Sequence, residues 1–142
     1  MIHVLIDPNI ILDFFLERKP FFQDAVKILT LAETRKIKVY ATSLSFSNAY
    51  YILRQVGSHI TVIESLRKLA RIAEVLSVDS KSIELALYSD FKDFEDALQY
   101  FSAAQRSEIN LIITRNTKDY KHSELPVMTP QDFLRSQRDK FR

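Results

Sequence analysis

The chain contains no cysteine, which excludes disulfides, thiolate zinc sites and cysteine nucleophiles. It has one glycine, Gly57, so neither a G-x-G-x-x-G dinucleotide loop nor a P-loop can be written in it. No apolar run approaches membrane-spanning length, and Met1 leads into an apolar stretch without a secretory signal. We therefore expect a cytoplasmic protein with no membrane partner.

The composition is that of an ordinary globular protein. Hydrophobic residues make up 46% and charged residues 27% of the 142 residues, enough for one domain with its own core. The net charge of +2 is too small to indicate nucleic-acid binding unless the basic residues gather on one face. We expect a single domain over residues 1–137 and a basic C-terminal tail over residues 138–142.

Strand and helix patterns alternate along the chain. Such alternation predicts an α/β fold with three layers, a central parallel sheet of about five strands and helices on both faces. Gly57 is expected to end the third helix as its C′ residue. Strands are expected at 1–6, 36–41, 74–78, 110–114 and 126–128, and helices at 10–16, 21–35, 44–55, 61–73, 80–88, 95–106 and 130–137.

The first candidate functional residue is Asp7. A short apolar run, Met1 to Ile6, precedes it, which is typical of a strand buried on both faces, and Pro8 favours a helix start. Ligands of parallel α/β sheets bind beyond the carboxyl ends of the strands, where Asp7 is expected. Asp is also a good helix N-cap, and this stretch alone does not separate the two roles.

Other acids are expected near Asp7. Asp119 follows the strong strand at 110–114, while Asp93 and Asp96 lie three residues apart at a helix start and share a face. Acids gathered without basic partners favour Mg²⁺ or Mn²⁺, which can activate water and stabilise phosphoryl charge. The simpler interpretation is that Asp93 and Asp96 cap a helix and that Asp119 is solvated.

Three motifs resemble those of the PIN domain family, and more narrowly its VapC-type toxin ribonucleases. They are the Ile-Asp-x-Asn-Ile-Ile-Leu-Asp start at 6–13, Glu-Asp-Ala at 95–97, and Thr-Arg-Asn-Thr-Lys-Asp-Tyr at 114–120. The resemblance implies a Mg²⁺- or Mn²⁺-dependent endoribonuclease that acts on structured RNA and is silenced by a cognate antitoxin. We also expect a homodimer.

The resemblance assigns roles to individual residues. Asp7, Asp96 and Asp119 match catalytic metal ligands, Asn9 supports the first acid, and Thr114 and Asn116 line the floor of the site. The family's second acid, normally a Glu, is replaced here by Asn48, which removes one negative charge. We hypothesise a one-metal site in which Asp93 supplies the missing carboxylate.

Two functions remain open at this stage. The first is metal-dependent RNA hydrolysis, in which a carboxylate orients the attacking water and basic groups contact RNA, Arg115 and Lys118 foremost. The second is a catalytically degenerate PIN fold that binds RNA or a partner protein, which Asn48 favours. A third hypothesis is a small phosphatase-like α/β protein. It would need a nucleophilic Asp at position 7 and a second Asp two residues later, where Asn9 stands.

Overall fold

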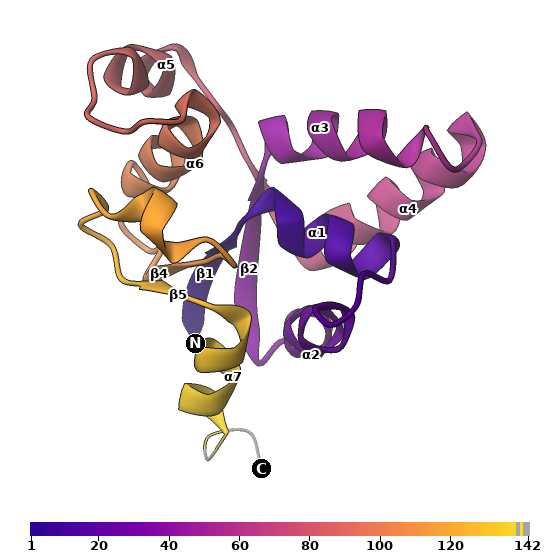
Figure 1. Ribbon diagram of the computed structural model, residues 1–142. Coiled ribbons are helices and arrows are strands. Elements are labelled where there is room, and N and C mark those ends of the chain that lie inside the picture. Colours follow the sequence, from indigo (N-terminus) through magenta and orange to yellow (C-terminus); the bar gives the residue numbers. More distant parts are fainter. Residues whose placement is uncertain (139, 141–142) are drawn as a thin grey trace.

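A five-stranded sheet forms the centre of the molecule (Figure 1), and each pair of neighbouring strands is parallel. The computed structural model describes residues 1–138 and 140. The strands are β1 (Ile2–Ile6), β2 (Ile37–Thr42), β3 (Ala73–Leu76), β4 (Leu111–Ile113) and β5 (Val127–Met128). Their order is β3-β2-β1-β4-β5, which places β1 in the middle. The predicted parallel α/β sheet is confirmed.

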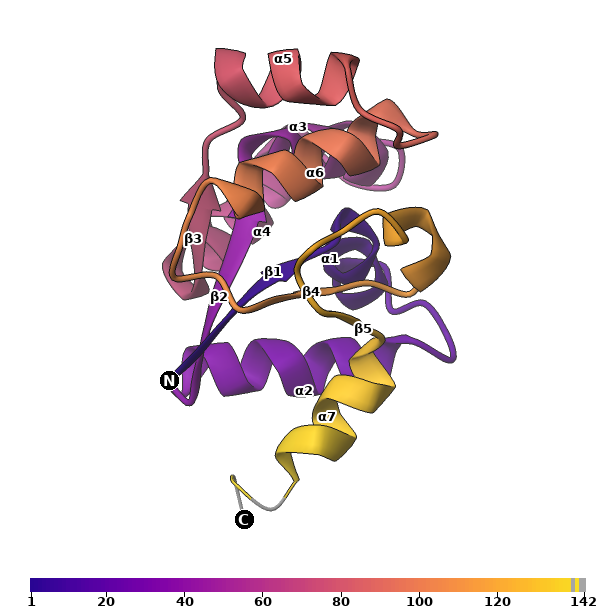
Figure 2. The same cartoon turned by 90° about the vertical axis from the view of Figure 1, so that its left-hand side faces the viewer.

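Helices cover both faces of this sheet. They are α1 (Pro8–Phe15), α2 (Phe22–Glu33), α3 (Ser43–Leu53), α4 (His59–Ile72), α5 (Ser80–Leu87), α6 (Phe94–Ala104) and α7 (Pro130–Gln137), with a 3₁₀ turn η1 (Thr117–Tyr120). Helices α1 to α4 and α7 pack in one core, while α6 packs on the opposite face and carries α5 outside it (Figure 2). The three-layer architecture follows from these two cores.

The alternation of β1 side chains explains its central place. Val4 and Ile6 point into the core beneath α1 and α2, and Leu5 points into the core beneath α6. All three side chains are fully buried. A strand whose apolar side chains point to both faces is best buried in the middle of a parallel sheet.

The register of β1 and β4 aligns the carboxyl ends of these two strands. Ile6 lies beside Ile113, so both strands end level, and the Asp7 backbone N–H donates to the Ile113 carbonyl at 2.9 Å. Asp7 and Thr114 therefore follow their strands at neighbouring positions. The sequence could predict this meeting because parallel strands end at a common edge.

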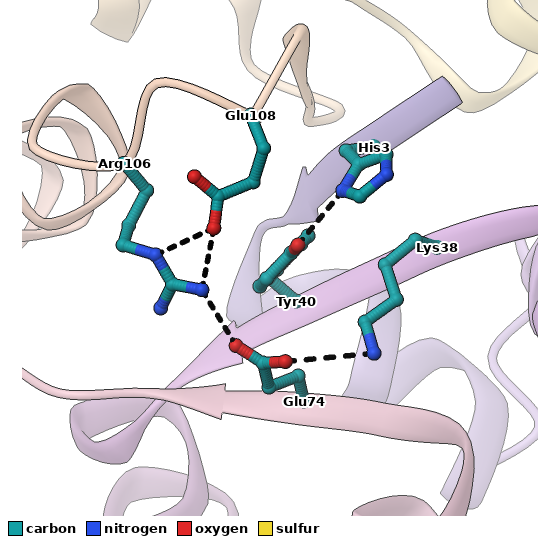
Figure 3. A network of polar contacts seen from close by, with 6 residues as sticks. All are labelled: His3, Lys38, Tyr40, Glu74, Arg106 and Glu108. Atoms are coloured by element: carbon teal, nitrogen blue, oxygen red, sulfur yellow. Dashed lines mark hydrogen bonds and ion pairs between the residues drawn. The ribbon is translucent and has the colours of Figure 1, made fainter. Parts of the chain in front are cut away.

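The amino end of β2 carries a polar network on the α6 side (Figure 3). Tyr40 OH lies 2.8 Å from His3 Nδ1, and Glu74 pairs with Lys38 at 3.5 Å and with Arg106 at 2.9 Å. Arg106 also pairs with Glu108. These contacts tie the end of α6 to β2 and β3, at the edge opposite Asp7.

The predicted role of Gly57 is wrong. Helix α3 ends at Leu53, and Gly57 does not have the positive φ of a left-handed C′ residue. Its carbonyl instead accepts a hydrogen bond from Arg54 Nη1 at 2.8 Å, which closes the turn toward α4. Of the predicted basic tail, residues 139, 141 and 142 lie outside the described residues.

Candidate metal centre at the carboxyl edge of the sheet

A cavity of about 480 Å³ lies beyond the carboxyl ends of β1 and β4. We call it the acid cavity. It is lined by Asp7, Pro8, Asn9, Leu12, Asn48, Tyr51, Ile52, Asp93, Glu95, Asp96, Gln99, Asn116 and Asp119. Every acid predicted for the site lines it, together with Asn9, Asn48 and Asn116. A larger hollow between α2 and α7 is lined by a single acid, Asp24, together with Lys27 and Arg135.

Asp7 combines the two roles that its sequence position suggests. Its Oδ1 accepts a hydrogen bond from the Asn9 backbone N–H at 2.9 Å and so caps α1, with Pro8 in the first turn. Its Oδ2 accepts from Tyr120 OH at 3.0 Å. Only 5% of Asp7 is exposed, and burial raises the pKa of its carboxyl against the lowering effect of these hydrogen bonds. Capping leaves further lone pairs for a ligand.

Asp96 lies half-buried in the first turn of α6. Burial raises its pKa to about 7, helped by repulsion from Asp93, Asp7 and Asp119, while Tyr120 lowers it. The Tyr120 hydroxyl therefore lowers the pKa of two carboxyls, those of Asp7 and Asp96. Burial and the charge of these carboxylates raise the pKa of Tyr120 itself. The three neighbouring acids thus disfavour the ionised form of Asp96.

Asp93 and Asp119 approach the cavity from exposed positions. Asp93 is the N-cap of α6 because its Oδ1 accepts from the Asp96 backbone N–H at 3.0 Å, which bears out the capping alternative. Asp119 lies in η1, and its backbone N–H donates to the Asn116 carbonyl at 3.0 Å. Both side chains nevertheless line the acid cavity.

Asn48 reaches the cavity from α3, on the opposite wall from α6. Its Nδ2 lies 3.4 Å from Glu95 Oε1, a long hydrogen bond. An acid at position 48 would face Glu95 with like charge, whereas the amide donates to it. The asparagine thus suits a cavity in which Glu95 already supplies a carboxylate.

The floor of the site is held by buried polar groups. Thr114 is fully buried, and its Oγ1 accepts from the Asn116 backbone N–H at 3.1 Å, which fixes the loop after β4. On the other side, Gln99 Nε2 donates to Thr42 Oγ1 at 2.9 Å and to Ser45 Oγ at 3.1 Å. Gln99 Oε1 is buried without a hydrogen-bond partner among the described residues.

The donor set suits a hard divalent cation. Carboxylate and amide oxygens line the cavity, and none of its lining residues is Lys, Arg or His. Within residues 1–138 and 140, however, no three acids or histidines lie close enough to form a ready ligand group. The exposed side chains of Asp93, Glu95 and Asp119 would have to turn inward to enclose an ion.

A second hollow of about 200 Å³ adjoins the first. Lys92, Lys118, Lys121 and His122 line it together with Asp93, Asp96 and Asp119, which also line the acid cavity. The three lysines are exposed. The predicted RNA contact of Lys118 stays a prediction, and this hollow is where it would be made.

Arg115 has a different environment. Its Nε lies 2.8 Å from Asp13 Oδ2 and its Nη2 donates to Asp13 Oδ1 at 3.1 Å, while its guanidinium stacks 3.9 Å above the Phe21 ring. Asp13 is 1% exposed, so the pair anchors the loop after β4 to α1. The predicted RNA contact of Arg115 stays a prediction, since its charge already has a buried partner.

Sequence reasoning missed three residues of the site. Tyr120, Glu95 and Gln99 stand in or next to quoted motifs, but tyrosine suggests packing, and Glu95 suggests only a favourable helix start. The one signal is helical spacing, since Gln99 follows Glu95 by four residues and Asp96 by three and so neighbours each of them on α6.

The comparisons with known proteins agree with this architecture. The sequence pattern of the PIN domain matches residues 3–118. The chain is 25% identical over 135 residues to ribonuclease VapC1 of Aquifex aeolicus, covering 92% of each chain.

Solved structures with the same fold include two toxin–antitoxin assemblies. VapBC2 of Rickettsia felis, bound to a DNA fragment from its promoter, contains a chain that superposes with a TM-score of 0.64 at 12% identity. A toxin–antitoxin complex from Klebsiella pneumoniae gives 0.64 at 22% identity. Each comparison covers 89% of this chain and 97% of the other.

Proposed function

The chain belongs to the PIN domain family, and on that premise we propose that it is a VapC-type endoribonuclease that hydrolyses RNA with a Mg²⁺ or Mn²⁺ ion held in the acid cavity. The observation that carries the proposal is the pairing of two hollows. Asp93, Asp96 and Asp119 separate an oxygen-lined cavity from one lined by three lysines. A phosphodiester needs both, a cation at the reacting phosphate and positive charge along the neighbouring backbone.

The residues of the acid cavity have different roles in this proposal. Asp7, Asp96 and Asp119 would hold the ion, Asp93 would add charge, and Asn9, Asn48, Thr114 and Asn116 would support them. When bound, the ion would supply positive charge for the phosphodiester and lower the pKa of a water molecule. One carboxylate orients the attacking water, while Tyr120 keeps Asp7 in place through its hydroxyl. Lys118, with Lys92 and Lys121, holds the flanking phosphates.

The test is cleavage of structured RNA with Mn²⁺ or Mg²⁺, comparing wild type with Asp96→Asn. We expect the wild type to cleave RNA and the variant to lose at least about a hundredfold in rate, because one of the proposed metal-binding carboxylates is removed. Chelation is expected to abolish cleavage. Equal cleavage by both proteins would identify a contaminating nuclease and contradict the proposal.

A second candidate function is a binding module without catalysis. Asn48 is the observation that favours it, because it removes an acid from the wall of the cavity. Such a protein would bind the same RNA with and without divalent cations and cleave it under neither condition. Binding without cleavage would therefore decide for this alternative.

We propose an antitoxin as the protein partner, by analogy with the two toxin–antitoxin assemblies. A groove of about 310 Å³ between α1, α2 and α4 offers apolar contacts from Phe14, Phe15 and Ile72. Lys68 and Arg71 also line it and outnumber its one acid, Glu33. This combination fits an amphipathic helix with acidic flanks. Charge reversal at Lys68 and Arg71 is expected to weaken capture of a co-expressed antitoxin.

We also propose that the chain forms a homodimer. Tyr51, Val56 and Ile60, at the junction of α3 and α4, are each about 70% exposed, which is unusual for large apolar side chains. Sedimentation equilibrium of wild type and Ile60→Glu would measure the association. A monomeric wild type would contradict it.

A further inference from the structure

We propose that Glu95 is the fourth carboxylate of the acid cavity and takes the electrostatic place that Asn48 leaves open. The proposal rests on the proposed function, since it concerns the cation of the same site. It assigns the role to the first residue of the Glu-Asp-Ala motif, a position to which the family resemblance gives no function. It also replaces Asp93 as the main source of the missing charge.

The placement of Glu95 is the first argument. Glu95 and Asn48 face each other across the acid cavity, and the contact from Asn48 Nδ2 engages only Oε1 of the glutamate. No lysine or arginine of the described residues pairs with Glu95, although six other ion pairs are formed. Its Oε2 is therefore available to a ligand in the cavity.

The competing residue, Asp93, is less available. Its Oδ1 accepts a hydrogen bond from the backbone N–H of Asp96 and so caps the N-terminus of α6. Its Oδ2 keeps lone pairs for a ligand, as those of Asp7 do, but turning the carboxylate farther into the cavity would leave that N–H unpaired and remove the cap of α6. Glu95 has a longer side chain and does not cap the helix, so it can turn toward an ion without removing the cap of α6.

Gln99 gives independent evidence that the cavity receives a ligand. The side chain is 1% exposed and lines the acid cavity one helical turn from Glu95. Its amide nitrogen is held by Thr42 and Ser45, while its buried Oε1 has no donor among the described residues. Leaving a buried carbonyl unpaired is costly. A water molecule carried by a bound cation would supply the donor.

The experiment is calorimetric titration with Mn²⁺ at fixed pH and ionic strength, without RNA. We expect Glu95→Gln to weaken Mn²⁺ binding about tenfold, as removal of one charge near a cation implies. Glu84→Gln, the same chemical change on the exposed face of α5, is the matched control and is expected to bind as wild type. Asp93→Asn keeps a capping side chain and is expected to lose less than Glu95→Gln.

A relocation variant completes the test. Asn48→Glu combined with Glu95→Gln moves the carboxylate to the opposite wall and is expected to restore affinity to within about threefold of wild type. Wild-type affinity in Glu95→Gln, or an equal loss in Glu84→Gln, overturns the inference and leaves the proposed function standing. A wild type that binds no Mn²⁺ overturns both. Circular dichroism verifies that each variant is folded.

Discussion

At the scale of single residues, Asp96 carries a negative charge that the acid cavity disfavours. Burial and three neighbouring carboxylates raise its pKa to about 7, against 3.8 for an ordinary aspartate. The folded protein therefore binds a proton that the unfolded chain has already released between these two pH values. Stability is greatest below pH 3.8 with respect to this group and falls as the pH rises toward 7.

We predict that the metal-free protein loses roughly 1–2 kcal/mol of unfolding free energy between pH 5 and pH 7.5 because of Asp96, a value reduced from the full pKa shift since the group is half exposed. Urea unfolding in chelator at several pH values measures it. In Asp96→Asn this part of the pH dependence should vanish, and Mn²⁺ should restore stability to the wild type at pH 7.5. A wild-type profile that rises over this range would contradict the prediction.

The sequence could identify most residues of the site but not their contacts. Asp7, Asp96 and Asp119 follow strand ends or begin a helix, and topology alone brings such positions to one edge. The partners of Arg115 could not be predicted, because Asp13 lies 102 positions away in sequence and Phe21 precedes another helix, α2. A charged residue beside a motif looks like a surface group until its buried partner is known.

At the scale of elements, the start of α3 depends on a buried polar cluster. Thr42 caps the helix by accepting the Ser45 backbone N–H at 3.0 Å, and Gln99 of α6 donates to both hydroxyls. Thr42 and Ser45 are fully buried. The cluster joins the two helices that carry Asn48 and Glu95, and so sets the width of the acid cavity.

We predict that Thr42→Val costs about 1–3 kcal/mol of unfolding free energy, because it removes the cap of α3 and leaves the Gln99 amide without one acceptor. Thr42→Ser retains the hydroxyl and should cost less than half as much. Urea unfolding at constant pH compares the two variants. Equal losses would show that the methyl group, which serine lacks, contributes as much as the hydroxyl, and would contradict the prediction.

Helix boundaries show where sequence patterns stop being sufficient. Caps at Thr42, Ser58 and Asp79 were predictable because their side chains need only local backbone N–H groups. The end of α3 was not, because Gly57 suggests a left-handed residue that the turn does not use. The orientation of Glu95 toward Asn48, 47 positions away, depends on how α3 and α6 pack.

At the scale of the whole molecule, the net charge of +2 hides an uneven arrangement. Lys92, Lys118 and Lys121 gather around the hollow beside the acid cavity, whereas Lys38 lies at the opposite edge of the sheet and pairs with Glu74 (Figure 3). Because three exposed lysines gather at this hollow, it is the surface where we expect RNA to lie. Within the described residues no helix is long and apolar enough to cross a membrane.

Lysines that contact phosphates release counterions when RNA binds, so their number appears in the salt dependence of the affinity. We predict that Lys118→Gln lowers the slope of log affinity against log salt by about 0.7 for a single-stranded target, with little change in sequence preference. The Asp96→Asn background prevents cleavage, and fluorescence anisotropy between low and moderate salt gives the slope. Lys38→Gln is the matched control, because it removes the same charge from a lysine already paired with Glu74. If both substitutions lower the slope equally, RNA responds to the overall charge of the molecule, and the hollow beside the acid cavity is not its path.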